Sequence, residues 1–337
     1  MDPLTHGLLG TVTAGLLSRE KQKENRWPIL VAGGAGALAP DLDVLIHSAS
    51  DPLLQLEFHR FFTHSLLFAP FGAVFVSGIL WLFLKNRLSF VTLWSFTLIG
   101  MLTSGVADAF TSYGTQLLWP FSDERIAWNL VSVFDPLFTV GILGGFLWSV
   151  ISKHKKGFFL SIVWALLYLN WAAWNHNRVK SEIINLADSR GHLPVSYLLA
   201  KPTIANNWLW SGKYVADDVL YTAGFHLLPW SEIKVYEGED TPLLDVSNFL
   251  STTPELDDLQ VNDIERFSVL SEGILIEHPE DSLLIGDGRY AMLPTSVKPL
   301  WGIRLKPKQP ESHVVFEEFR STDPEIVNRF KEMLMGR

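Results

Sequence analysis

Residues 65–84 read SLLFAPFGAVFVSGILWLFL, an apolar run without a single charged side chain. Its length matches the roughly 20 residues that an α-helix needs to cross a lipid bilayer. Three further runs of comparable length and hydropathy lie at residues 90–110, 134–151 and 158–174. Four such runs rarely share the core of one soluble protein. The sequence therefore predicts a polytopic α-helical membrane domain with four long transmembrane helices.

Two shorter apolar stretches, at residues 4–17 and 28–39, precede the long runs. Stretches of roughly 10–14 residues are typical of re-entrant or buried segments. The second contains VAGGAGALA at residues 31–39, and small residues at this density let helices approach closely in lipid. We expect the pair to form a hairpin of two short helices packed against the four longer ones.

The charged residues divide the chain of 337 residues into two domains. The formal net charge of −9 falls entirely after residue 175, whereas the more apolar half before it is neutral. This contrast predicts a membrane domain at residues 1–175 and a soluble domain at residues 176–337. The acidic balance argues against nucleic acid as a partner, because phosphate binding requires clustered Lys and Arg. The absence of cysteine excludes disulfides, thiolate metal sites and cysteine nucleophiles.

The second half has the alternating composition of a small α+β domain. Residues 273–277, 282–285 and 313–316 are rich in branched apolar side chains and are bounded by Gly, Pro and acidic residues, which indicates strands. Residues 323–335 begin with an Asp and a Pro and place apolar side chains at helical spacing. These features predict a helix near the C-terminus.

Basic residues concentrate in alternate connections between the predicted membrane segments, and the positive-inside rule places such connections in the cytoplasm. Nine residues belong to this set: Arg19, Lys21, Lys23, Arg26, Lys85, Arg87, Lys153, Lys155 and Lys156. The intervening connections, residues 40–64 and 111–133, contain only Arg60 and Arg125 as basic residues. We therefore expect these two connections and the C-terminal domain to lie on the outer side of the membrane.

Ionisable residues of the membrane half gather at the outer ends of its predicted segments. They are Asp2, His6, Asp41, Asp43, His59, His64, Asp108 and Asp135. Such groups at membrane depth are costly and commonly mark function. Imidazole and carboxylate together suit Zn²⁺ or Mn²⁺. The sequence thus predicts a shared metal or catalytic site on the outer face.

Each of these residues also has a structural explanation when it is considered alone. His6 is a candidate for helix packing, and Asp41 and Asp135 are candidates for helix caps. His59 and His64 would lie about 140° apart on a single helix, so both face one metal only if His59 precedes the helix. Asp41 and Asp43 point together only from an extended segment or a turn. Their joint location favours the shared site.

Four short motifs occur in order along the membrane half. They are MDPLTHG at residues 1–7, PDLD at 40–43, HR-x-x-THS at 59–65 and D-x-x-TSYGTQLLWPFS at 108–122. Together they resemble the YdjM-like family of membrane-bound metal-dependent hydrolases, a group with a distant likeness to zinc-dependent phospholipase C. The resemblance covers the chain from residue 1 to about residue 140.

The resemblance implies a multi-pass protein of the bacterial inner membrane that binds a divalent metal, Zn²⁺ or Mn²⁺. It implies six metal ligands: His6, Asp41, Asp43, His59, His64 and Asp108. We expect Asp41, Asp43 or Asp108 to act as a general base. Four residues are expected to contact the substrate: Arg60, Thr111, Ser112 and Arg125. Four more are expected to support the ligands: Asp2, Thr63, Ser104 and Asp135.

One residue departs from the family pattern. Ser104 stands four residues before Asp108, where the family is expected to have a histidine. This difference removes an expected ligand and leaves fewer side chains to hold a metal.

The expected function is a metal-dependent hydrolase at the outer face of the inner membrane. A site at bilayer depth favours a membrane lipid or a lipid-linked phosphoester as substrate. A first alternative is a catalytically weak, metal-stabilised scaffold that binds an envelope partner, which the serine at position 104 favours. A second is a transporter, which is disfavoured because no charged residue lies within the cytoplasmic half of a predicted span.

Overall fold

The computed structural model of the protein describes residues 1–19, 24–252, 256–307, 309, 311–320 and 323–337. Of the basic residues assigned to the cytoplasm, Lys21 and Lys23 lie outside these ranges. The chain forms two compact units. The membrane unit comprises Met1–Ile46, Phe58–Trp174 and Ile204–Asn206, and the C-terminal unit comprises His47–Glu57, Asn175–Thr203 and Asn207–Arg337.

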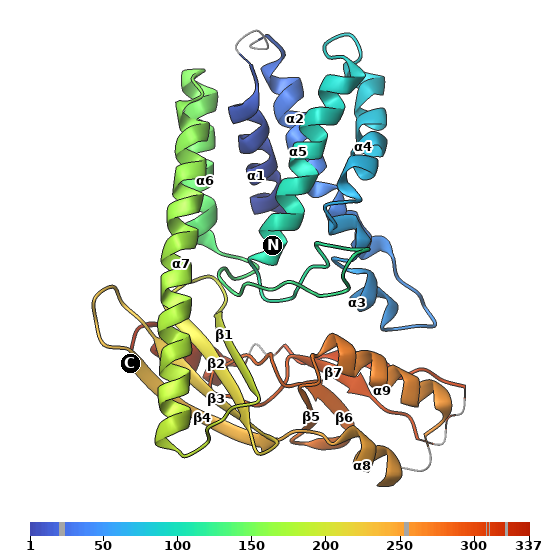
Figure 1. Cartoon of the computed structure of the whole chain (residues 1–337), viewed down its shortest axis with the longest axis vertical. Helices are drawn as coiled ribbons and strands as arrows, with labels where there is room; N and C mark the ends of the chain where they lie inside the picture. Colours follow the sequence, from blue (N-terminus) through green and yellow to red (C-terminus); the bar gives the residue numbers. More distant parts are fainter. Residues whose placement is uncertain (20–23, 253–255, 308, 310, 321–322) are drawn as a thin grey trace. The chain divides into compact units, whose positions relative to one another are not determined.

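Helices make up the membrane unit (Figure 1). The longer ones are α1 (Pro3–Leu17), α2 (Arg26–Leu38), α4 (Ala69–Leu84), α5 (Phe90–Ala109), α6 (Pro136–Ser152) and α7 (Lys156–Ser189). Short turns of helix connect them, η2 (Pro40–Leu45) and η3 (Phe62–His64), whereas α3 (Leu54–Phe58) lies almost entirely in the segment assigned to the C-terminal unit. Helix α7 continues past Trp174 into the C-terminal unit.

The prediction of four long transmembrane helices is not supported. Within the described residues, only α5 and α7 are single helices long and apolar enough to cross a membrane. A third candidate is the pair formed by Leu54–His64 and Ala69–Leu84, which is bent by 88°. Helix α6 is apolar but has only 17 residues. The apolar runs at 65–84 and 134–151 are longer than their helices, because proline near the start of α4 and α6 marks where each helix begins.

Close backbone contacts join the first two helices to α5. A Cβ atom at Gly33 would collide with the carbonyl oxygen of Gly10, and one at Gly36 would collide with that of Thr97. Glycine at these two positions therefore allows α2 to lie directly against α1 and α5. The small residues of 31–39 had predicted this close packing.

The C-terminal unit is a small soluble β-sheet region with helices, as predicted. One antiparallel sheet contains β1 (Tyr197–Pro202), β2 (Leu209–Ala216), β3 (Val219–His226) and β4 (Lys234–Pro242) in that order. The other contains β5 (Leu275–His278), β6 (Asp281–Asp287), β7 (Trp301–Arg304) and β8 (Val315–Glu318). Its further helices are α8 (Val246–Thr252), α9 (Asp258–Leu270) and α10 (Pro324–Leu334). The predicted strands correspond to β5, β6 and β8, and the predicted last helix is α10.

A segment from the first half of the chain folds with the C-terminal unit. Residues His47–Glu57 belong to it, and Leu53 is fully buried against apolar residues of α9. The Arg266 guanidinium lies 2.9 Å from a carboxylate oxygen of Asp51 and 2.7 Å from one of Glu57. The predicted boundary at residue 175 placed residues 47–57 in the membrane domain, whereas they fold with the C-terminal unit.

Candidate metal centre

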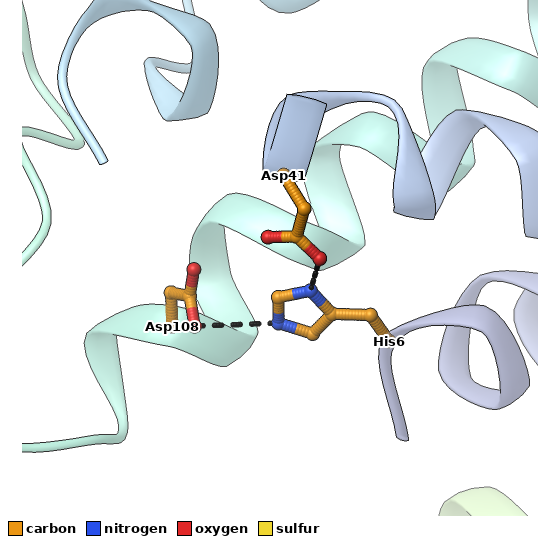
Figure 2. A group of neighbouring side chains, drawn as sticks. All are labelled: His6, Asp41 and Asp108. Atoms are coloured by element: carbon orange, nitrogen blue, oxygen red, sulfur yellow. Dashed lines mark hydrogen bonds and ion pairs between the residues drawn. The ribbon is translucent and has the colours of Figure 1, made fainter. Parts of the chain in front are cut away.

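His6 lies between two carboxylates that come from different parts of the chain (Figure 2). Its Nδ1 is 2.9 Å from Asp41 Oδ2, and its Nε2 is 3.3 Å from Asp108 Oδ1. The imidazole and the Asp108 side chain are fully buried, whereas the Asp41 side chain is 21% exposed. Helix α1, the turn η2 and the last turn of α5 thus bring one side chain each to a common point.

His64 contributes a second imidazole to the same group. It ends the short turn η3 before α4, and its Nε2 lies 3.1 Å from Asp108 Oδ2 and 3.4 Å from Asp41 Oδ1. The side chain is fully buried. We call His6, Asp41, His64 and Asp108 the polar cluster.

Several buried atoms of the polar cluster lack hydrogen-bond partners among the described residues. They are His6 Nε2, His64 Nε2 and Asp108 Oδ2. Each of these imidazole nitrogens lies 3.1–3.3 Å from an Asp108 oxygen but without the alignment of a hydrogen bond. One ligand atom each from His6, Asp41 and Asp108 also lie within 4.8 Å of one another. Converging imidazole nitrogens and carboxylate oxygens fit a divalent cation such as Zn²⁺ or Mn²⁺.

Asp43 contacts His64 at the ring nitrogen that points away from the centre of the polar cluster. Its Oδ2 lies 3.2 Å from His64 Nδ1, the ring nitrogen that does not face Asp108. The same oxygen accepts hydrogen bonds from the Arg60 backbone N–H and the Thr63 hydroxyl, both at 2.9 Å. A carboxylate on the second nitrogen of a ligating histidine fixes the orientation of the ring.

His59 reaches this arrangement through Asp43. Its Nδ1 lies 2.8 Å from Asp43 Oδ1, and the histidine side chain is 36% exposed. The centres of the His59 and His64 rings are 6.3 Å apart. The structure therefore places His59 at the exposed edge of the site, beside Asp43.

The two carboxylates of the turn η2 have lowered pKa values. Burial alone would raise the pKa of Asp41, but hydrogen bonds with His6 and His64 outweigh burial and lower this pKa to about 2. Burial likewise opposes ionisation of Asp43, but hydrogen bonds with His59 and His64 hold its pKa below the usual range. Both groups are thus negatively charged at neutral pH, as cation ligands need to be.

A family model for the YdjM inner membrane protein matches residues 1–179, more than half of the chain. The chain belongs to the YdjM family. The resemblance seen in the sequence motifs is thereby confirmed, and with its apolar helices the protein is assigned to the inner membrane. The family match covers every residue of the polar cluster.

Two curated relatives share part of this sequence. The chain is 31% identical over 147 residues to the uncharacterized protein YfhP of Bacillus subtilis, covering 42% of this chain and 44% of YfhP. It is 35% identical over 112 residues to the inner membrane protein YbcI of Escherichia coli, covering 31% of this chain and 62% of YbcI. The matched stretches thus span about half the length of these relatives. No solved structure matches the chain.

A buried arginine adjoins the polar cluster in this YdjM family member. Arg60 Nη2 lies 3.1 Å from Asp108 Oδ1, and Nη1 donates to the Thr111 hydroxyl at 2.8 Å. Its guanidinium also stacks over the ring of Tyr113 at 5.5 Å. Arg60 has a φ of 61°, a conformation uncommon outside glycine and often found at functional sites.

Two contacts of the site were not expected from the sequence. The amino group of Met1 pairs with Asp108, and the ring of Tyr113 lies over Arg60. Met1 precedes His6 by five residues within the MDPLTHG motif, which is the only signal the sequence offers for its position.

Ser104 occupies the position at which the family is expected to have histidine. Its side chain is fully buried, and its hydroxyl lies 3.3 Å from His6 Nδ1. The serine also lies one helical turn before Asp108 on α5. The departure from the family pattern therefore falls directly beside the polar cluster.

The remaining candidate residues make other described contacts. Asp2 caps α1, accepting the backbone N–H of Thr5 at 3.0 Å. Asp135 caps α6 and accepts the Tyr168 hydroxyl at 2.6 Å. Arg125 donates to the backbone oxygen of His59 at 3.1 Å, and Ser112 is half-buried in the loop after α5. Asp2 and Asp135 thus act as helix caps, and Asp135 also links α6 to α7 through Tyr168.

Proposed function

We propose that the protein is a membrane-bound metal-dependent hydrolase. The observation that carries this proposal is the convergence of three buried groups: His6 Nε2, His64 Nε2 and the Asp108 carboxylate. Among the described residues, neither nitrogen nor Asp108 Oδ2 has an aligned hydrogen-bond partner. A divalent cation held there would supply Lewis-acid activation of water and of the substrate oxygen.

The side chains around that position favour distinct roles. The Asp41 side chain is partly exposed, whereas those of Asp108 in the polar cluster and of the neighbouring Asp43 are fully buried. Access therefore favours Asp41 as the group that accepts a proton from water. Arg60 keeps a buried Nε without a hydrogen-bond partner among the described residues. This N–H is available to bind an anionic oxygen of the substrate.

The rim of the site supports a lipid or lipid-linked phosphoester as substrate. On η2, Asp41 and Asp43 alternate with Leu42, which is 62% exposed, and Leu45, which is 67% exposed, lies just beyond them. Apolar side chains beside the carboxylates suit a molecule with a polar head and an apolar tail. A phosphate group would match the charge of Arg60.

Turnover of a phosphodiester tests this activity. Purified protein supplied with Zn²⁺ or Mn²⁺ is expected to hydrolyse bis-p-nitrophenyl phosphate or a short-chain phospholipid. Arg60→Gln should lower kcat/KM about 10- to 100-fold, because a charge-assisted hydrogen bond to the substrate is lost. The matched control is Arg26→Gln at the start of α2, which removes an arginine that donates to the backbone oxygen of Ser149, away from the site. Turnover no greater than that of His6→Ala with either metal would reject the hydrolase.

We further propose that the site and the C-terminal unit face outward. The basic residues of the alternate connections support this orientation through the positive-inside rule. A phosphatase that folds only outside the cytoplasm, fused after Arg337, should be active. Activity of a cytoplasm-only reporter at the same position would reverse the assignment.

A second candidate is a metal-stabilised scaffold that binds an envelope partner. Ser104 favours it, because a serine stands where a further ligand is expected. Metal binding without turnover of any phosphoester or carboxyl ester would select the scaffold over the hydrolase.

A further inference from the structure

The loop between β3 and β4 carries an apolar tip that projects into solvent. Trp230 is 94% exposed, the highest value among the large apolar side chains of the described residues, and Leu228 is 51% exposed. Pro229 lies between them and is also exposed. Neighbouring exposed apolar groups commonly mark a surface that contacts another phase or molecule.

Burial of the residue before this tip and hydrogen bonds of the residue after it fix its position. Leu227, which directly follows β3, is buried in the core of the C-terminal unit. Arg178 of α7 donates from Nη2 to the backbone oxygen of Ser231 at 2.8 Å. Ser231 also donates from its hydroxyl to the backbone oxygen of Leu228 at 3.2 Å. The exposed tryptophan therefore sits on a loop that is attached to helix α7.

Arg178, to which the loop is attached, lies close to the end of the apolar part of α7. Arg178 follows Trp174 by four residues, about one helical turn and a rise of about 6 Å. Trp174 is the last residue of the apolar run 158–174, so Arg178 lies just beyond the hydrocarbon-spanning part of the helix. This depth corresponds to the headgroup region, where Trp side chains are enriched.

We propose that Leu228, Pro229 and Trp230 insert into the outer interfacial layer of the bilayer and anchor the C-terminal unit to the membrane surface. Lipid is favoured over a partner protein because the loop is attached to α7 at interfacial depth. An amphipathic indole gains from burial of its ring while its N–H stays hydrated. This anchor is independent of the proposed hydrolase activity, and its place on the outer side rests on the proposed orientation.

The absence of cysteine makes a direct test possible in the full chain. Trp230→Cys is labelled with an environment-sensitive fluorophore and reconstituted in nanodiscs of phosphatidylethanolamine and phosphatidylglycerol, in separate preparations with one and with two copies per disc. The matched control is Glu237→Cys on β4, a side chain that is 80% exposed. Glu237 pairs with Arg190, which directly follows the end of α7 at Ser189, about 16 Å further along the helix axis than Arg178.

Lipids that carry a nitroxide near the headgroup should quench the fluorescence of both labels to different degrees. Quenching at position 230 should be roughly twofold or more stronger than quenching at position 237. The emission of the label at position 230 should also shift to the blue. Equal quenching at the two positions would overturn the proposal. Shielding that occurs only in discs with two copies would also overturn it, because a second chain would then be the occupant. Since Trp230 is on the surface, both variants should fold, which circular dichroism verifies.

Discussion

Replacing His64 with alanine is expected to lower the affinity of the protein for Zn²⁺ or Mn²⁺ by more than about a hundredfold. Loss of a residue that only supports a ligand typically costs 10- to 100-fold, and His64 offers Nε2 directly to the centre of the polar cluster. His6→Ala should have an effect of the same size, because His6 Nε2 faces Asp108 in the same way. Metal titration of the purified variants measures both values.

Variants of two histidines outside the polar cluster serve as controls for this result. His59→Ala should weaken binding by about tenfold, because His59 contacts Asp43 at the edge of the site. His154→Ala should leave affinity unchanged, because this exposed residue lies in the connection before α7. Unchanged metal content in a variant that lacks both His6 and His64 would reject these two residues as ligands.

Ser104→His is expected to make the stability of the protein strongly dependent on metal. An imidazole at this position would lie beside His6 and one turn before Asp108, where it adds a ligand. Without metal, the larger buried ring lacks a partner, which costs about 1–3 kcal/mol and lowers the melting temperature. With saturating metal, each tenfold gain in affinity restores about 1.4 kcal/mol.

Melting temperatures with and without Zn²⁺ or Mn²⁺ measure this effect. Ser104→Leu is the matched control, since it adds similar bulk without a ligand atom. The increase in melting temperature on adding metal should be larger for Ser104→His than for the wild type, and smaller for Ser104→Leu than for Ser104→His. If no metal rescues Ser104→His, the end of α5 around Asp108 is a structural helix end and the metal assignment there is wrong.

Hydropathy predicted the class of the membrane unit but overestimated its long helices. Apolar composition does not report where the backbone turns. The run at 65–84 includes the turn before α4, which starts at Ala69. The run at 134–151 includes Asp135, which caps α6. Both runs therefore appear longer in the sequence than the helices they contain.

The sequence motifs predicted which residues meet but not how they are paired. Asp41 and Asp43 were expected to point together only from an extended segment or a turn, and the structure has the 3₁₀ helix η2 there. The division of their roles depends on geometry, because Asp41 faces His6 whereas Asp43 faces His59.

The sequence did not predict that residues 47–57 fold with the C-terminal unit. It depends on contacts between residues more than 200 positions apart, such as Asp51 with Arg266. Neither residue carries a local signal of that pairing, since both have the composition of an exposed connection or helix surface.

Diffraction data collected at the zinc and manganese absorption edges test the central claim most directly. Crystals grown with saturating metal should give an anomalous peak at about 2.0–2.2 Å from His6 Nε2, His64 Nε2 and a carboxylate oxygen of Asp108 or Asp41. The peak should be absent from crystals of the variant that lacks both histidines. Wild-type crystals that show no peak between these side chains, with either metal present in excess, would contradict the account.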